Sequence, residues 1–509
     1  MTATKLLVLG LDAADQDLML GWAQDGSLPH FARLMETGSY CEMLAPPGQY
    51  AGSIWPSIHT GCSPARHGRY FHQQLQRGTY GYAKFLPPDL KEAPFWERLS
   101  RAGRRVAILD VPKAPVAREL NGLQLLDWGA HDPEYDHARS CPESLASEIE
   151  ARHGKAPIPS CDTVARDAAG LPALRDGLLE RIRTKAHIIE DLLGRGPWDL
   201  LMAVFSESHC AGHQFWRVHD QGHPQHDPSL ARSLGDPLKD VYVALDEAIG
   251  QLVDGAGPDT RVVVFSSHGM GPHYDGTFLL RDIVRRLHAA EGRHRSAPVE
   301  ALRWLWRRLP RAARKRSRSA AVPIKRSLDH EETTDRDYFV VPTNDNCAGI
   351  RINLEGREPQ GRVPPGRAYD ELCAKISERL LEIVNVESGE PLVRRILRSG
   401  ELFKGPYVDD LPDLNIVWNR SAPVRKIRSP GIGTIEHSFA GWRSGDHRSK
   451  GFVLVRDPQI GHGSSPAISA MDLAPTLCAW FGVELDADGS PAEWGHASLN
   501  SPLNGDMPH

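Results

Sequence analysis

The stretch KLLVLGLDAAD, residues 5–15, decides the fold of this chain. Residues 6–11 are apolar without interruption and show no alternation with polar side chains. That pattern is typical of a central parallel strand buried on both faces, because a strand with one wet face alternates. Asp12 follows directly, so we expect a carboxylate at the carboxyl end of a buried strand. Such a carboxylate pairs, binds a metal or caps the next helix, and this residue alone leaves those roles open.

Further apolar runs have the same character as the first. They cover residues 106–109, 200–205 and 262–265. The segments between them carry helical patterns, at residues 93–102, 175–193 and 240–253. Strands that alternate with helices predict an α/β fold with a doubly wound, mostly parallel sheet flanked by helices. Ligands gather at the carboxyl ends of the strands in such sheets, and residues 207–213 and His268 are expected there together with Asp12.

A length of 509 residues predicts more than one simple core. We expect residues 1–274 to form the α/β core, residues 275–435 an inserted cap or substrate region, and residues 436–509 the C-terminal part of the core. Elements are also predicted for the later part of the chain, a strand at residues 350–354 and helices at residues 368–384 and 471–481. Residues 303–318 (RWLWRRLPRAARKRSR) carry eight Arg or Lys, which indicates a solvated insertion or a basic amphipathic helix.

Composition and charge bound the class of protein. Hydrophobic residues make up 40% and charged residues 25% of the chain, an ordinary globular composition. The formal charge of −5 gives no reason to expect a nucleic acid polymer as partner. No apolar stretch approaches the roughly 20 residues of a membrane span, and the N-terminal apolar run is too short for a signal peptide. The eight cysteines form no CxxC pair, so we expect reduced thiols in a cytoplasmic enzyme.

Histidines supply the main chemical signal besides Asp12. His209 and His213 are four residues apart in SESHCAGH, residues 206–213. On a helix this spacing places both imidazoles on one face, where they chelate a divalent cation; a histidine-rich loop is the alternative. His268 in FSSHGM and His447 in SGDHRSKG each lie near the end of an expected strand. Taken singly, these two segments are weak signals.

Together these segments resemble the type I phosphodiesterase/nucleotide pyrophosphatase branch of the alkaline phosphatase superfamily. The resemblance covers nearly the whole chain and includes TGCSPARHG at residues 60–68, GIRINLEGREPQG at residues 349–361 and MDLAPTL at residues 471–477. It implies an alkaline phosphatase-like fold with an inserted cap and a site for one or two divalent cations, zinc foremost and manganese as an alternative. The metal ligands that it implies are Asp12, His209, His213, Ser267, His268 and His447.

The sequence departs from the family's pattern in both metal sets and at the nucleophile. His209 replaces an aspartate, so one site would consist of His209, His213 and His447 with an open position. Ser267 replaces an aspartate beside His268, so the other site should bind its ion more weakly, bind a different ion or stay empty. The family's nucleophile position falls on Ala51. Ser53, two residues later, is the expected nucleophile unless it caps the following helix.

The resemblance implies a metal-dependent hydrolase of phosphate esters, foremost a phosphodiesterase, that uses a hydroxyl nucleophile or metal-bound water. Its expected substrate is a small phosphate or sulfate ester. The alternative is a family member that has lost hydrolysis and binds a phosphorylated or sulfated partner through a residual metal site. The clustered histidines favour hydrolysis, whereas the lost carboxylates and the displaced nucleophile favour the alternative. The sequence carries no signal for the identity of the ester or for an oligomeric state.

Overall fold

The computed structural model divides the chain into two compact units. Unit 1 comprises Met1–Tyr70, Leu86–His273 and Ala440–His509, and unit 2 comprises Phe71–Phe85 and Tyr274–Phe439. The residues that the structure describes are 5–48, 50–158, 161–164, 168–291, 334–343, 347–437, 441–457 and 460–494. The basic stretch at residues 303–318 lies outside the described residues.

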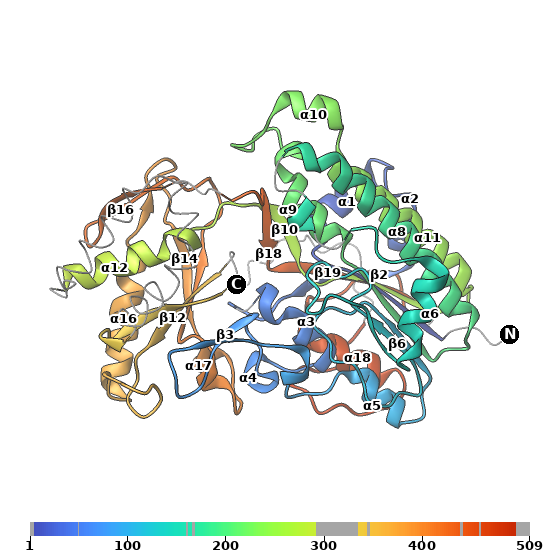
Figure 1. The fold of residues 1–509 in the computed structure, drawn as a ribbon, viewed down its shortest axis with the longest axis horizontal. Helices are drawn as coiled ribbons and strands as arrows, with labels where there is room; N and C mark the ends of the chain where they lie inside the picture. The colour runs from blue at the N-terminus through green and yellow to red at the C-terminus, as the bar shows by residue number, and fades with distance from the viewer. Residues whose placement is uncertain are drawn as a thin grey trace. The chain divides into compact units, whose positions relative to one another are not determined.

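Unit 1 is built around a ten-stranded sheet with the order β20-β2-β19-β9-β1-β8-β5-β6-β7, in which β21 also pairs with β2 (Figure 1). The strands are β1 (Leu6–Leu11), β2 (Ser39–Leu44), β5 (Val106–Leu109), β6 (Gly122–Leu126), β7 (Arg139–Cys141), β8 (Leu200–Phe205), β9 (Arg261–Ser266), β19 (Lys450–Arg456), β20 (Gly463–Ser464) and β21 (Ile468–Ser469). Strands β19 and β7 run antiparallel to their neighbours, and the other pairs are parallel. The predicted doubly wound, mostly parallel α/β sheet is therefore confirmed.

Strand β1 shows why an uninterrupted apolar run folds as a central strand. Leu7, Leu9 and Leu11 belong to one hydrophobic cluster. Leu6 and Val8 belong to a second cluster on the opposite face, because successive side chains of a strand point to opposite sides. All six residues of β1 are buried, since helices cover both faces of the sheet (Figure 1).

The helices of unit 1 separate into two layers. The first cluster includes side chains of α1 (Gln16–Gln24), α2 (Pro29–Thr37), α6 (Ser144–His153), α8 (Leu171–Gly194), α9 (Glu207–His219) and α11 (Pro237–Ala256). The second includes side chains of α3 (Tyr50–Thr60), α5 (Phe95–Arg101) and α18 (Leu473–Ala479). Unit 1 also contains the short helices α4 (Pro64–His67), α7 (Cys161–Val164) and α10 (Pro228–Leu234). Helices α5, α8, α11 and α18 fall on the four stretches in which the sequence predicts helices of this unit.

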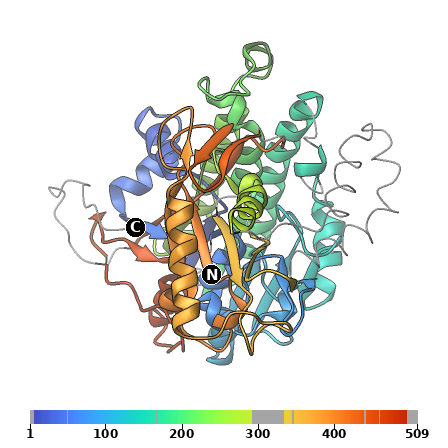
Figure 2. The same ribbon diagram turned by 90° about the vertical axis from the view of Figure 1, so that its left-hand side faces the viewer.

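Unit 2 has a core of its own, built on a four-stranded antiparallel sheet. Its strands, in spatial order, are β11 (Tyr338–Val341), β12 (Cys347–Ile352), β15 (Leu414–Trp418) and β14 (Val393–Arg398). Helices α12 (Leu280–Ala290) and α16 (Arg367–Leu381) pack into the same core, and α16 is the long orange helix of Figure 2. The smaller elements are β3 (Gln73–Leu75), β4 (Tyr82–Lys84), β13 (Val384–Asn385), α17 (Ser399–Leu402), β16 (Lys426–Ser429) and β17 (Gly433–Glu436).

The predicted strand at residues 350–354 and the predicted helix at residues 368–384 correspond to β12 and α16. Unit 2 contains the residues assigned to the insertion and, in addition, Phe71–Phe85. None of the described helices combines the length and the apolar character needed to cross a membrane.

Candidate metal centre

The carboxyl ends of three neighbouring strands of unit 1 carry most of the predicted site residues. Asp12 follows β1, helix α9 with His209 and His213 follows β8, and Ser267 and His268 follow β9. His447 comes from β18 (Gly445–Arg448), which pairs with β10 (Gly269–Pro272). In that pairing His447 lies opposite Met270, two residues after His268. The structure thus brings together residues that are more than 400 positions apart in the sequence.

Three imidazoles converge at this place through the same ring atom. The Nε2 atom of His209 lies 3.0 Å from Nε2 of His213 and 2.9 Å from Nε2 of His447. His209 and His213 share one face of α9, as the four-residue spacing predicts. All three side chains are buried. Three neighbouring imidazole nitrogens are the ligand type of a three-histidine metal site.

The protonation of these rings supports a cation at the point of convergence. Gly445 O accepts a hydrogen bond of 2.8 Å from Nδ1 of His213, so Nδ1 carries the proton and Nε2 presents a lone pair. Burial lowers the pKa of His213 and that of His447 well below the usual histidine value, so both rings are neutral. The lone pair on Nε2 of His213 faces Nε2 of His209 at 3.0 Å, so a proton or a cation must lie between the two nitrogens. The three rings therefore fit a divalent cation.

Asp12 holds the His209 ring in place. Its Oδ2 atom accepts a hydrogen bond of 2.7 Å from Nδ1 of His209, so Nε2 is the ring nitrogen that faces His213 and His447. Burial alone would raise the pKa of Asp12, but the charge and hydrogen bond of His209 outweigh burial and hold that pKa below its usual range. A carboxylate behind a histidine fixes the tautomer and raises the basicity of the ligand nitrogen. In this geometry Asp12 orients a metal ligand, whereas the resemblance implies that it binds a cation directly.

Asp12 Oδ1 is engaged by two other donors. The indole Nε1 of Trp55 donates to it at 2.8 Å, and the hydroxyl of Ser267 donates to it at 3.0 Å. Ser267 Oγ also lies 2.8 Å from Nδ1 of His268. A second cation between Asp12 and Ser267 would have to displace these protons. The hydrogen bond from Trp55 to Asp12 is thus a second reason, besides the replacement of an aspartate by Ser267, to expect weak binding of a cation at the second site.

His268 presents an unused nitrogen. Because the Ser267 hydroxyl donates to Asp12, Nδ1 of His268 donates to Ser267 and Nε2 carries the lone pair. This Nε2 is buried and has no hydrogen-bond partner among the residues that the structure describes. Burial lowers the pKa of His268 to about 4, although the charge of Asp12 opposes the shift. A buried, neutral nitrogen without a partner is suited to accept a hydrogen bond from a ligand or to bind a cation.

Ser53, the predicted nucleophile, is buried in α3. The same helix brings Trp55 to Asp12. Residues two apart on an α-helix are about 200° apart around its axis, so Ser53 and Trp55 leave α3 in different directions. The role of Ser53 as nucleophile stays a prediction, and this geometry does not favour it.

Further side chains near the three histidines were not predicted from the sequence. A ligand atom of Asp446 lies within 4.8 Å of one from His213 and one from His447, and His131 forms a similar group with His209 and His213. Asp446 precedes His447 directly, and a carboxylate beside a candidate ligand was the signal that could have found it. His131 lies five residues after the carboxyl end of β6, where ligands of a parallel sheet gather. The orientation of Trp55 has no signal in the sequence.

A buried ion-pair network fixes the start of α9. Arg181 Nε donates to Oε1 of Glu207, the first residue of α9, at 2.6 Å, and both side chains are fully buried. Lys185 Nζ lies 3.0 Å from Asp110 Oδ2 and 3.6 Å from Glu207 Oε1. Two cations and two carboxylates balance here, so α8 holds the N-terminus of α9 by charge as well as by apolar packing. The Glu207 carboxylate is therefore engaged in its ion pair with Arg181.

Another buried histidine gives unit 1 a specific sensitivity to acid. Both ring nitrogens of His59, in α3, lack a hydrogen-bond partner among the described residues. Burial, aided by the positive charge of Arg69, lowers the pKa of His59 to about 3. Below pH ~6.5 the unfolded chain therefore binds a proton that the folded chain excludes, and stability falls by about 1.4 kcal/mol per pH unit. His59→Phe should remove about 2 kcal/mol of the stability loss between pH 6.5 and pH 5.

Urea unfolding of the metal-free wild type and of His59→Phe at pH 7.5, 6.5 and 5 measures this difference. Both proteins are compared without metal, so that release of a cation in acid does not contribute. The same dependence of stability on pH in both proteins would show that His59 takes no part in it.

Known structures share this fold. Phosphonoacetate hydrolase from Sinorhizobium meliloti, in complex with phosphonoformate, superposes with a TM-score of 0.54 at 15% sequence identity, covering 93% of this chain and 94% of that chain. Murine ectonucleotide pyrophosphatase/phosphodiesterase 5 in complex with AMP gives a TM-score of 0.49 at 13% identity, covering 96% and 97%. No curated protein matches the chain significantly in sequence. At these identities the hydrolase structure is similar to this chain in fold.

A match to a family's sequence profile shows which family the chain belongs to. The profile of type I phosphodiesterase/nucleotide pyrophosphatase matches residues 6–422, which include Asp12, the segment at residues 60–68, His209, His213 and His268. This match covers most of the chain and supports a phosphoester hydrolase of the phosphodiesterase or pyrophosphatase type. The chain belongs to the type I phosphodiesterase/nucleotide pyrophosphatase family.

Proposed function

We propose that this protein hydrolyses a small phosphate ester, foremost a phosphodiester, at one divalent cation held by His209, His213 and His447. The convergence of three Nε2 atoms, with those of His213 and His447 within 3.0 Å of that of His209, carries the proposal. Membership of the family supports phosphoester hydrolysis as the class of reaction. Bound there, a divalent cation would attract the phosphoryl oxygens and lower the pKa of a water molecule. Three imidazoles suit zinc, and manganese is the second choice.

The protein's own residues prepare this site for a cation. Asp12 and the carbonyl of Gly445 keep the protons of His209 and His213 on Nδ1, so that Nε2 is ready to bind. The burial of the ligands lowers the local dielectric, which strengthens the attraction between a cation and an anionic ester. His268 offers its neutral Nε2 to a hydroxyl of the substrate or of water. These roles require no carboxylate at positions 209 and 267.

Metal content and turnover test the proposal together. We expect about one divalent ion per chain and hydrolysis of bis-p-nitrophenyl phosphate at a higher rate than p-nitrophenyl phosphate or p-nitrophenyl sulfate. Removal of the ion by a chelator should abolish turnover, and added Zn²⁺ or Mn²⁺ should restore it. A protein that binds no ion and turns over none of these esters with either ion would refute the proposal.

The same turnover assay on the Ser53→Ala variant distinguishes the Ser53 hydroxyl from water as the nucleophile. The direction of Trp55 on α3 supports attack by water, so we expect this variant to keep turnover within about tenfold of the wild type. Loss of turnover together with retention of the bound ion would instead assign the attack to the Ser53 hydroxyl.

One observation favours the second candidate function, a protein that binds a phosphorylated or sulfated partner without hydrolysis. Trp55 donates to the Asp12 oxygen that a second cation would need, so the centre holds less positive charge than a two-metal site. Calorimetric titration with the same phosphate esters separates the two functions. Binding that depends on the ion but is followed by no turnover would favour the second.

A further inference from the structure

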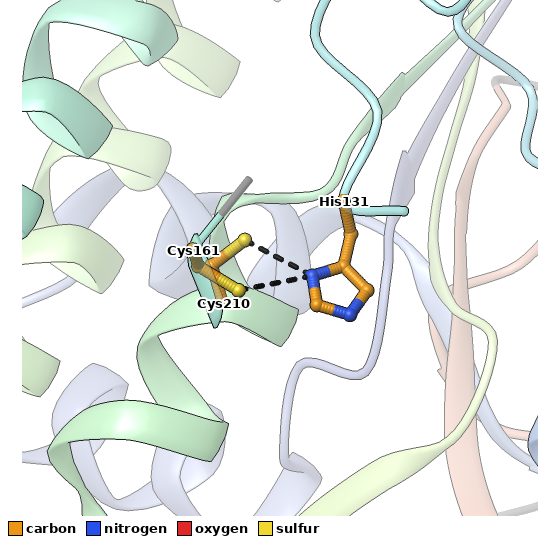
Figure 3. A group of neighbouring side chains, drawn as sticks. All are labelled: His131, Cys161 and Cys210. Carbon is orange, nitrogen blue, oxygen red and sulfur yellow. Dashed lines mark hydrogen bonds between the residues drawn. The ribbon is translucent and has the colours of Figure 1, made fainter. Parts of the chain in front are cut away.

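A second group of potential metal ligands lies beside the three-histidine centre in unit 1. Nδ1 of His131 is 3.2 Å from Sγ of Cys210 and 3.2 Å from Sγ of Cys161 (Figure 3). The three residues come from the loop after β6, from α7 and from α9. All three are buried, and their ligand atoms lie within 4.8 Å of one another. Figure 3 shows both sulfur atoms directed at the same ring nitrogen.

One ring nitrogen of His131 faces two sulfur atoms, more than it can hydrogen-bond at once. An imidazole nitrogen carries either one proton or one lone pair in the ring plane, so Nδ1 serves one of the two sulfur atoms at a time. Cys210 Sγ also accepts from Nη2 of Arg181 at 3.5 Å, which favours a negative charge on this sulfur. Cys161 Sγ also lies within hydrogen-bonding reach of Cys210 Sγ, and it has a long contact of 4.0 Å with Asp162 Oδ1. A cation at the focus would bind all three atoms at once.

We infer that His131, Cys161 and Cys210 form a second metal site, specific for a thiophilic divalent cation of the zinc class. Zinc binds nitrogen at ~2.0 Å and sulfur at ~2.3 Å in tetrahedral geometry, which sets the two ligand atoms roughly 3.5 Å apart. The observed separations of 3.2 Å require only a small outward movement. Two thiolates and one neutral imidazole balance the charge of a divalent cation, as burial demands. Thiolate ligands select against manganese and magnesium.

The site joins three segments next to the catalytic centre. The cation would fasten the loop after β6 and helix α7 to α9, the helix that also carries His209 and His213. The ring of His131 stacks on that of His209, with ring centroids 3.9 Å apart and an interplanar angle of 26°. The second site therefore supports the position of His209 through His131. Its occupancy does not depend on the proposed hydrolysis.

Cobalt(II) distinguishes the two sites in the intact protein. Cobalt bound by thiolates absorbs strongly in the near ultraviolet through sulfur-to-metal charge transfer, whereas cobalt bound by imidazoles alone does not. We expect the full-length, metal-depleted wild type to develop this absorption on addition of cobalt, and zinc to displace it. Cys161→Ala and Cys210→Ala should each lose the absorption and about one equivalent of bound zinc. His213→Ala should keep the absorption while it loses the other equivalent.

A matched control is Cys478→Ala, which removes a buried cysteine from the opposite hydrophobic cluster and should leave the absorption unchanged. Alkylation of the wild type gives a readout that needs no variant, because zinc should protect two cysteines that react in the metal-free protein. The inference fails if the wild type shows neither charge-transfer absorption nor zinc-dependent protection. It also fails if mass spectrometry of the isolated protein finds a disulfide between Cys161 and Cys210 where zinc-protected thiols are expected.

Discussion

Alanine in place of His213 should empty the three-histidine centre and lower the turnover of a phosphodiester by roughly 10³-fold. Mutation of residues that only orient a metal ligand typically costs 10- to 100-fold, and the loss of one of three direct ligands should cost more. His213 faces His209 at 3.0 Å, and the Gly445 carbonyl holds its Nδ1, so its removal leaves two of the three imidazoles at the centre. Metal analysis and kcat for bis-p-nitrophenyl phosphate measure the effect.

Two further variants calibrate this result. His226→Ala removes a histidine that donates to the Arg217 carbonyl, and it should keep both metal and turnover. Asp12→Asn retains an oxygen for Nδ1 of His209 but loses the charge behind it, so we expect a loss of about 10- to 100-fold. A His213→Ala protein with full metal content and full activity would place the reaction elsewhere in the molecule.

Arg181→Met should lower the free energy of unfolding by about 3–5 kcal/mol. Arg181 and Glu207 are both fully buried, and their side chains meet at 2.6 Å. Methionine fills part of the space but leaves the Glu207 carboxylate with Lys185 as its remaining cation, at 3.6 Å. The cost comes from a buried charge that has lost its partner, which exceeds the value of the pair itself. Urea unfolding of the wild type and the variant measures the difference.

The chain offers a matched control on the same helix. Arg183 pairs with Glu180 at 2.9 Å, and its side chain is 62% exposed, so Arg183→Met should cost less than 1 kcal/mol or so. In the double variant Arg181→Met with Glu207→Gln, the charge that destabilises the single variant is gone, and most of the loss should be recovered. An equal loss for Arg181→Met and Arg183→Met would contradict the role assigned to the buried network.

Much of the fold could be predicted from the sequence, because a strand buried on both faces of a sheet is an uninterrupted apolar run in the sequence. The uninterrupted run at residues 6–11 predicts β1, and the runs at residues 200–205 and 262–265 predict its two neighbours. Strand β19 lies in the same sheet but runs antiparallel between β2 and β9. Its direction depends on how the chain returns after unit 2, so its apolar pattern does not encode it.

The candidate site was predictable where its geometry is local. The spacing of His209 and His213 fixes a shared helix face, and the positions of Asp12 and His268 after apolar runs place them at one edge of the sheet. The contacts of Asp12 with Trp55 and His209 depend on side-chain directions across different elements, which no local pattern records. The same reason hides the meeting of His131 with Cys161 and Cys210, since those three residues come from three separate segments.

The central place of β19 has a consequence for biosynthesis. Strand β2 pairs with β19, β20 and β21, all of which are translated after residue 449. One edge of β9 also pairs with β19 and has no partner before that strand is synthesised. A nascent chain that has not reached Lys450–Arg456 therefore leaves β2 without any strand partner and one edge of β9 unpaired, a state prone to association with other chains. His447 emerges from the ribosome immediately before this strand. Closure of the sheet and completion of the three-histidine set therefore both depend on one short segment, Gly445–Arg456, that is translated after all the strands β1 to β9.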